Sequence, residues 1–139
     1  MRIKIITIGK VREKLYQNRI QEYLKWISKY SKIEIISLKD TYRKNQKKSL
    51  LSYLNSDSFT ICLSEEGEQK TSEQFSKFLY GINKEVIFII GSSNGHPDFV
   101  RKLSNKIISL SKMTFLHEMS LLILSEQIFR AITIKHGRE

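Results

Sequence analysis

The sequence has little cysteine, proline or glycine. Cys62 is its single cysteine, which excludes an internal disulfide framework and favours a reducing compartment. One proline and six glycines occur in 139 residues, and no Gly- or Ser-rich linker divides the chain. We therefore expect a single domain over residues 1–139. No stretch approaches the roughly 18 apolar residues of a membrane span, and residues 1–9 lack the pattern of a signal peptide. These absences predict a soluble cytoplasmic protein with no membrane partner.

Acidic residues are also scarce beside basic ones. The chain has 14 Asp and Glu against 24 Lys and Arg, a formal net charge of +10. Residues 1–50 carry the whole excess, with 14 basic and 4 acidic residues, whereas residues 51–139 hold 10 of each sign. A concentrated positive field attracts polyanions such as nucleic acid. Taken alone, the charge is explained equally well by a solvated, solubilising face.

Short β-branched runs alternate with amphipathic stretches along the chain. The strand 86–90 is apolar at five successive positions, which is typical of the middle of a parallel sheet. Helical spacing begins at Tyr16, a Thr71–Gln74 capping box opens a second helix, and Pro97 suits the first turn of a third. The alternation predicts an α/β fold with a mainly parallel sheet flanked by helices. The predicted strands are residues 3–8, 33–38, 59–63, 86–90 and 107–110.

The last predicted helix runs from about His117 to Lys135, with Gly137 just past its end. Its apolar residues go most of the way around, so it must be covered on more than one side. A second subunit could cover one side of this helix, and the alternative is that it is a central core helix of a monomer. Glu126 and Arg130 are i, i+4 neighbours on this helix, and their apolar surroundings favour a partly buried orienting pair over an exposed bridge.

Ligands of open parallel sheets bind at the carboxyl ends of strands. Three such ends stand out here, at Leu63, Gly91 and Leu110. Gly91 and Gly95 are expected to adopt positive φ and to let the backbone approach a ligand closely. After the first end, the acidic cluster of Glu65, Glu66 and Glu68 is interpreted as a solvated loop.

Several chemistries are poorly supported by the sequence. The glycine pattern is neither a dinucleotide-binding fingerprint nor a phosphate-binding P-loop. No Gly-x-Ser-x-Gly elbow occurs. His96, His117 and His136 lack the spacing of a metal site, so no metal is expected. Cys62 falls inside a predicted strand and is interpreted as a small buried hydrophobe.

Four segments then carry a resemblance to a known family. They are Met-Arg-Ile-Lys-Ile-Ile-Thr-Ile-Gly-Lys at the start, Ile-Ile-Gly-Ser-Ser-Asn-Gly in the centre, Leu-Ser-Lys-Met-Thr-Phe-Leu-His-Glu-Met, and Ser-Glu-Gln-Ile-Phe-Arg-Ala. In this order they resemble the RlmH (YbeA-like) family of the SPOUT superfamily, and the similarity spans essentially the whole chain. The family comprises the pseudouridine N3-methyltransferases of bacterial large-subunit ribosomal RNA.

The resemblance implies a SPOUT-type α/β knot with a C-terminal trefoil, and an obligate homodimer. It implies S-adenosylmethionine as cofactor, and N3 of a pseudouridine in a stem-loop of 23S rRNA of the assembled ribosome as target. By motif position, the cofactor contacts fall on the three strand ends already noted. They are Leu63, Gly91, Leu110, Ser111, Lys112, Met113, Thr114 and Phe115.

Further roles are hypotheses built on the resemblance. His117 follows the cofactor loop and is a candidate acid, base or orienting group, the alternative being a structural histidine that caps the last helix. Arg130 is a candidate for RNA phosphate or for fixing Glu126. RNA contacts are expected from the basic first third of the chain, at Lys44, Lys47 and Lys48.

Two departures from the family pattern keep other functions open. Relatives have Arg where Leu121 stands, and they end in a Tyr-His-Lys or Tyr-His-Arg tail that this chain lacks. Both are polar groups expected near the active site. The alternatives are therefore a non-catalytic ribosome- or RNA-binding relative, and a small flavodoxin-like protein that binds another nucleotide.

Overall fold

The computed structural model describes residues 1–39, 43–92 and 95–137, in which five strands alternate with five helices. The alternation predicted from the β-branched runs and amphipathic stripes is confirmed. The elements are β1 Arg2–Ile8, α1 Lys14–Ile27, β2 Lys32–Leu38, α2 Arg43–Leu51, β3 Ser58–Gln69, α3 Ser72–Tyr80, β4 Glu85–Ile90, α4 Asp98–Leu103, β5 Lys106–Ser109 and α5 His117–Lys135.

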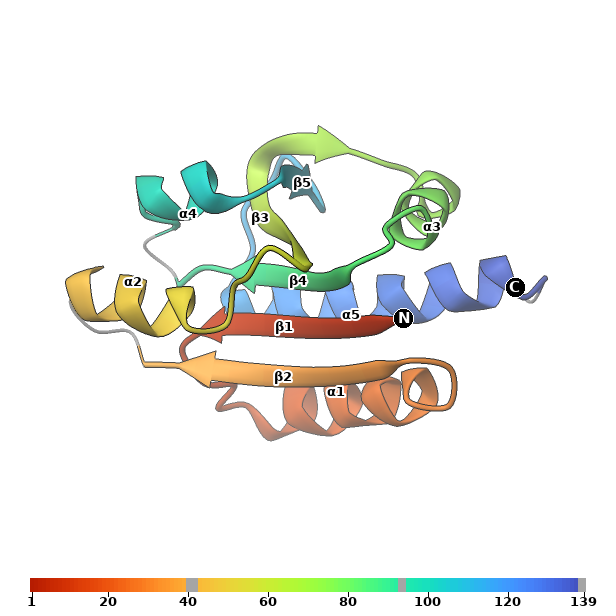
Figure 1. The fold of residues 1–139 in the computed structure, drawn as a ribbon. Helices are drawn as coiled ribbons and strands as arrows, with labels where there is room; N and C mark the ends of the chain where they lie inside the picture. Colours follow the sequence, from red (N-terminus) through yellow and green to blue (C-terminus); the bar gives the residue numbers. More distant parts are fainter. Residues whose placement is uncertain (40–42, 93–94, 138–139) are drawn as a thin grey trace.

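The strands form one sheet in the order β2-β1-β4-β3-β5, and every pairing between neighbours is parallel (Figure 1). β4 lies at the centre between β1 and β3. Its five residues 86–90 are all buried, as their unbroken apolar run predicted. Because the strands are parallel, their carboxyl ends meet at one edge of the sheet, where ligands of such sheets bind.

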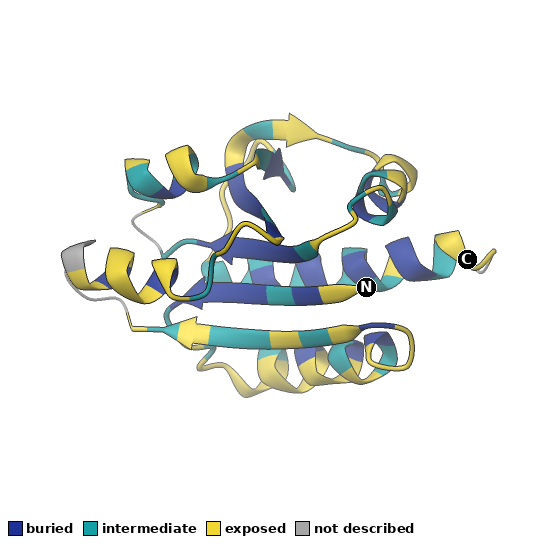
Figure 2. Ribbon diagram, viewed as in Figure 1, coloured by how far each residue is buried: buried dark blue, intermediate teal, exposed yellow. Residues whose placement is uncertain are grey.

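Helices cover both faces of the sheet (Figure 1). α1, α3 and α5 pack on one face, in a core that includes Phe88 and Leu124. α2 and α4 lie on the other face, where Leu50 and Val100 pack with Cys62. Figure 2 shows burial concentrated on β1, β4 and the first half of β3, while β2 is more exposed. The sheet therefore has two separate apolar layers, one on each side.

Local signals set the helix ends. The Thr71 hydroxyl accepts from the Gln74 backbone N–H at 3.1 Å, and the Gln74 side chain accepts from the Thr71 N–H at 2.9 Å, so the predicted capping box is present. α5 has the predicted bounds, and Gly137 beyond it has φ of 71°. Pro97 is the residue before the first turn of α4 rather than within it.

Three expectations about the elements were wrong. The charged segment from Arg43 forms α2, which was not predicted because its apolar signal is confined to its end, where Leu50 is buried. β5 ends at Ser109, one residue before Leu110. β3 continues to Gln69 instead of ending at residue 63.

The continuation of β3 is an irregular pairing that sequence patterns do not encode. β3 pairs with β5 at residues 61–63, shifts register, and pairs again at Glu68 and Gln69. The acidic cluster of Glu65, Glu66 and Glu68 thus belongs to a strand rather than a solvated loop. Gly67 lies directly on β5, because a Cβ added there would come within 2.7 Å of the Ile107 and Ile108 backbone.

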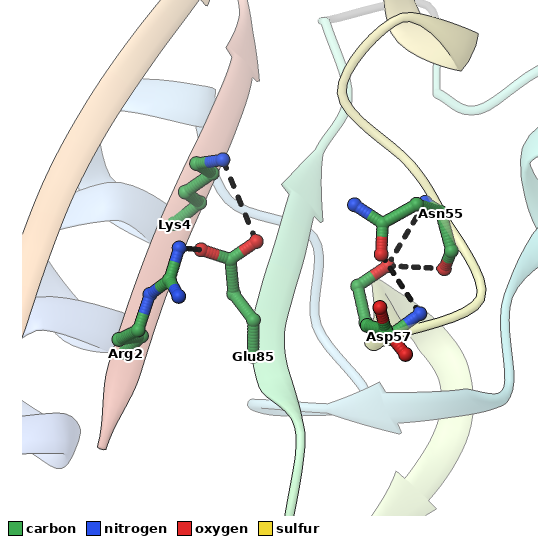
Figure 3. Close-up of polar contacts among 6 residues, drawn as sticks. Arg2, Lys4, Asn55, Asp57 and Glu85 are labelled. Carbon is green, nitrogen blue, oxygen red and sulfur yellow. Dashed lines mark hydrogen bonds and ion pairs between the residues drawn. The ribbon is translucent and has the colours of Figure 1, made fainter.

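Charged side chains gather at the opposite, amino end of the strands. Figure 3 shows Arg2 and Lys4 of β1 converging on Glu85 of β4, at 3.5 and 3.4 Å. In the turn before β3, Asn55 accepts from the Asp57 backbone N–H through its side chain. These contacts join β1 to β4 and shape the entry to β3, far along the strands from their carboxyl ends.

Candidate functional site

A cavity of about 330 Å³ opens at the carboxyl edge of the sheet. It lies where residues 63–65 in the middle of β3 and the end of β4 meet the segment that follows β5. This volume is at the lower end of the roughly 300–1,000 Å³ typical of small-molecule sites. Its lining residues are Leu63, Ser64, Glu65, Ile90, Gly91, Ser92, Gly95, His96, Leu110, Ser111, Met113, Thr114, Phe115, His117 and Ser120.

Most of the site residues expected from sequence line this cavity. Lys112 is not among the lining residues, although both its neighbours are. The residues expected from sequence that do line the cavity are Leu63, Gly91, Leu110, Ser111, Met113, Thr114, Phe115 and His117. Segments more than 40 residues apart in the chain therefore converge on one space, as the parallel sheet predicts.

The segment after β5 forms a short folded wall. The Ser109 hydroxyl donates to the Ser111 carbonyl at 2.7 Å, and the Ser111 hydroxyl accepts from the Met113 N–H at 3.0 Å. Met113 is 76% exposed and Phe115 is 40% exposed, which is unusual for apolar side chains. These bonds hold the segment together, and its residues Leu110, Ser111, Met113, Thr114 and Phe115 line the cavity.

His96 joins two walls of the cavity. Its Nε2 lies 2.6 Å from the Leu63 carbonyl, which links the segment after β4 to the middle of β3. Burial is the main reason why the pKa of His96 is lowered, with a smaller lowering from the Arg101 guanidinium and opposing effects from the Leu63 carbonyl and Glu65. A neutral ring that donates from Nε2 keeps Nδ1 as an acceptor. Sequence reasoning missed His96, whose only signal was its place beside the glycine pair.

The two glycines of this segment differ. Gly95 has φ of 77°, as expected, but Gly91 does not have a positive φ. Gly91 is instead required for space: a Cβ there would lie 3.1 Å from the Gly95 carbonyl and 3.1 Å from the His96 ring. The close approach occurs within the protein's own loop, which packs tightly against itself.

His117 lies at the start of α5 and lines the cavity. Its Nε2 is 3.2 Å from the Lys10 carbonyl in the segment after β1. The N-cap residue is Leu116, which makes no side-chain capping bond, so the capping role considered for His117 is not observed. Beside it, Glu118 accepts from the Arg12 N–H at 2.6 Å. The ring is thus held at the cavity by a contact across the fold.

Arg130 lies outside the cavity lining. Its Nε donates to Glu126 at 3.2 Å, and their side chains are 54% and 39% exposed, so the pair is more exposed than its apolar surroundings predicted. Tyr23 also donates to Glu126, at 3.1 Å. Leu121 is 1% exposed within the core and is not itself a lining residue, although Ser120 directly before it is.

The basic residues expected to bind RNA lie on α2. Lys47 and Lys48 are exposed, and the Lys47 ammonium lies 5.7 Å from the Phe99 ring centre of α4. Lys44 belongs to the same helix, but its side chain is outside the described residues. In the part of the chain that the structure describes, no group of three His, Cys, Asp or Glu could hold a metal ion, and no helix is long and apolar enough to cross a membrane.

The parallel sheet and the cavity at its carboxyl edge define an α/β protein with a candidate small-molecule site. The chain matches the family described as "Predicted SPOUT methyltransferase" over residues 1–139 and belongs to that family. It is 39% identical over 155 residues to the "Ribosomal RNA large subunit methyltransferase H" of Bacillus cytotoxicus, covering 99% of this chain and 97% of the relative. Proteins of the same name from Bacillus thuringiensis strain Al Hakam and Bacillus cereus strain B4264 match with the same identity and coverage.

Proposed function

We propose that this protein is an S-adenosylmethionine-dependent methyltransferase that acts on large-subunit ribosomal RNA in the cytoplasm. The observation that carries the proposal is the convergence on one cavity of Leu63 in β3, Gly91 directly after β4 and Leu110 directly after β5. Family membership and the name of the similar proteins supply the reaction and the substrate class. The finer target follows from the resemblance to the RlmH family and is N3 of a pseudouridine.

The cavity suits a nucleoside cofactor in several ways. It offers apolar surface from Leu63, Leu110 and Phe115 for a flat base, and the side chains of Thr114 and His117 for polar atoms. Gly91, which has no side chain, also lines the cavity. When bound, S-adenosylmethionine supplies a methyl group activated by a sulfonium. The protein must hold the methyl carbon in line with N3 of the target base.

His117 is the proposed acid, base or orienting residue. The imide proton must leave N3 as the new carbon–nitrogen bond forms, and a histidine ring within the cavity is suited to accept it. Its Nε2 contact with the Lys10 carbonyl fixes the ring. Replacing His117 by Ala should lower methyl transfer about 100-fold or more. His136→Ala, an exposed histidine at the far end of α5, is the matched control and should retain activity.

The basic α2 surface is proposed to hold RNA phosphates, with Lys44, Lys47 and Lys48. Replacing Lys47 and Lys48 by Gln should weaken ribosome binding and lower the slope of log affinity against log salt by roughly 0.7–0.9 per lost contact. The same change at the exposed Lys77 and Lys84 is the control. Cofactor affinity should be unchanged in both variants, and its loss would contradict the proposed division of roles.

A homodimer with a trefoil knot belongs to the same proposal. The outward face of α5 supports the dimer, because its apolar residues Met119, Leu122 and Ile123 are only half buried. Leu116, just before the helix, is 68% exposed. In the dimer, Arg130 is proposed to meet RNA phosphate or to hold Glu126 in place. Mass measurement in solution tests the dimer, and a monomer at micromolar concentration would reject it.

The deciding experiment is methyl transfer from labelled S-adenosylmethionine to ribosomes from a strain that lacks the modification. Incorporation into 23S rRNA, mapped to one pseudouridine, would support the proposal. Cofactor and ribosome binding without transfer would instead identify a non-catalytic relative. Failure to bind the cofactor at millimolar concentration by calorimetry would reject both and favour a protein that binds another nucleotide.

A further inference from the structure

The charge of the cavity is opposite to the charge of the whole chain. The protein carries +10, yet none of the described residues that line the cavity is Lys or Arg. Glu65 is the one acidic residue among them. With histidines counted as neutral, the lining therefore has a formal charge of −1. Charge of one sign in a cleft selects ligands of the other sign.

The three carboxylates of this part of β3 have different surroundings. Glu66 forms an ion pair with Arg101 at 3.4 Å, and Glu68 forms ion pairs with Lys70 at 3.0 Å and Lys106 at 2.6 Å. No ion pair of Glu65 is found among the described residues. The register shift of β3 between Leu63 and Glu68 interrupts the regular alternation of faces here, and of the three carboxylates only that of Glu65 belongs to a residue that lines the cavity. Its charge is thus the one that is left to act on the cavity.

Glu65 also acts electrostatically on the cavity wall. It opposes the lowering of the His96 pKa, while Arg101 contributes to that lowering. Arg101 itself is directed elsewhere: it donates to the His96 carbonyl at 3.3 Å, pairs with Glu66 and Asp98, and is not a lining residue. Arg101 therefore forms its ion pairs with Glu66 and Asp98, and no ion pair of it with Glu65 is found among the described residues.

We propose that Glu65 makes the cavity selective for the cationic methyl donor over its neutral thioether product. The inference rests on the proposed function. Transfer breaks the bond from sulfur to the methyl carbon, and the electrons of that bond stay on sulfur. The sulfonium charge is thereby removed, and N3 gains the methyl group as its proton leaves. A carboxylate in the cavity attracts the ligand before this step more than after it, which favours exchange of product for fresh donor.

The test is calorimetry of S-adenosylmethionine and S-adenosylhomocysteine with the unmodified chain and with Glu65→Gln. The variant should weaken binding of the sulfonium ligand about threefold, the size expected for an exposed charge pair, and leave the thioether ligand unchanged. Glu65→Lys should change the ratio of the two affinities by about tenfold, because it reverses the charge. Glu66→Gln is the matched control, since it removes an adjacent carboxylate outside the lining, and should leave the ratio unaltered.

Three results are possible and each is decisive. The proposal is supported if the ratio of the affinities for S-adenosylmethionine and S-adenosylhomocysteine changes in Glu65→Gln and stays the same in Glu66→Gln. In the unmodified chain, high salt should also make this ratio smaller. An equal change for both ligands, or no change, overturns it while the proposed cofactor function stands. Failure of the unmodified chain to bind either ligand overturns both. Thermal unfolding of each variant checks that the exposed substitution leaves the fold intact.

Discussion

Gly67 is the position where the structure makes its sharpest stability prediction. It lies in the bulged part of β3, and a Cβ added there would be 2.7 Å from the Ile107 carbonyl carbon, the Ile107 oxygen and the Ile108 carbonyl carbon. Carbon atoms in contact prefer about 3.5–4.0 Å. All three atoms are backbone, so a side-chain rotation cannot relieve the clash. In Gly67→Ala, β5 must therefore move away by about 1 Å.

The cost follows from how β5 is held. It has four residues and, within the described chain, pairs with β3 alone, so the shift strains or breaks that ladder. Overpacking of this kind costs about 1–3 kcal/mol. For a chain of this size that lowers Tm by roughly 3–10 °C. Because β5 leads into Leu110 and the wall that follows, S-adenosylmethionine affinity should fall in the same variant.

Cys62 provides a second readout of the same change. Burial raises the pKa of its thiol to about 12, so the folded protein should react slowly with thiol reagents. Cys62 lies on β3 opposite Ile107 of β5. Loosening of this pair in Gly67→Ala should speed labelling at pH 8, under conditions where the protein remains folded.

Gly81→Ala is the matched control for Gly67→Ala. At Gly81, which caps α3, an added Cβ would meet its nearest neighbours, the carbonyl oxygens of Lys77 and Phe78, at 3.3 and 3.4 Å. Small adjustments accommodate that methyl group, so its effect on Tm should be much smaller. If the two variants unfold within about 1 °C of each other, the reasoning about β5 is wrong.

Three further predictions concern the cap, the pH response and the core. Thr71→Ala removes the hydroxyl that accepts from Gln74 and should cost about 1 kcal/mol in urea unfolding, whereas Thr71→Ser should restore most of it. The lowered pKa of His96 means that the unfolded chain binds its proton more readily. The contribution of His96 to stability is therefore present above about pH 6.5 and is lost as the pH falls toward the pKa of the folded state. The free energy of unfolding of the unmodified chain and of His96→Gln, measured at several pH values, should show this difference. Parallel pH dependences of the two proteins would refute it. Leu124→Ala, at a fully buried position, should cost about 2–5 kcal/mol, against little for the more exposed Leu103→Ala in the same thermal assay.

Much of this fold could be predicted from the sequence because its signals are local. The unbroken apolar run 86–90 requires burial on both faces, which only a central parallel strand provides. The Thr71–Gln74 box and Gly137 set helix ends through bonds and dihedral angles within a few residues. The meeting of Leu63, Gly91 and Leu110 at the cavity followed from the same reasoning, because parallel strands bring their carboxyl ends to one edge, although β3 itself continues past Leu63 to Gln69.

The sequence by itself determined the alternation of strands and helices, apart from α2, and which three positions meet at the cavity, namely Leu63, Gly91 and Leu110. Only the tertiary structure decided what depends on contacts between distant segments. β3 extends past Leu63 because β5 supplies a partner in a second register, and this turns the acidic cluster into a strand with Glu65 on the cavity. His96 became part of the site through the Leu63 carbonyl, 33 residues away in the chain. Periodicity reports only which face a residue takes within its own element, so neither contact could be read from it.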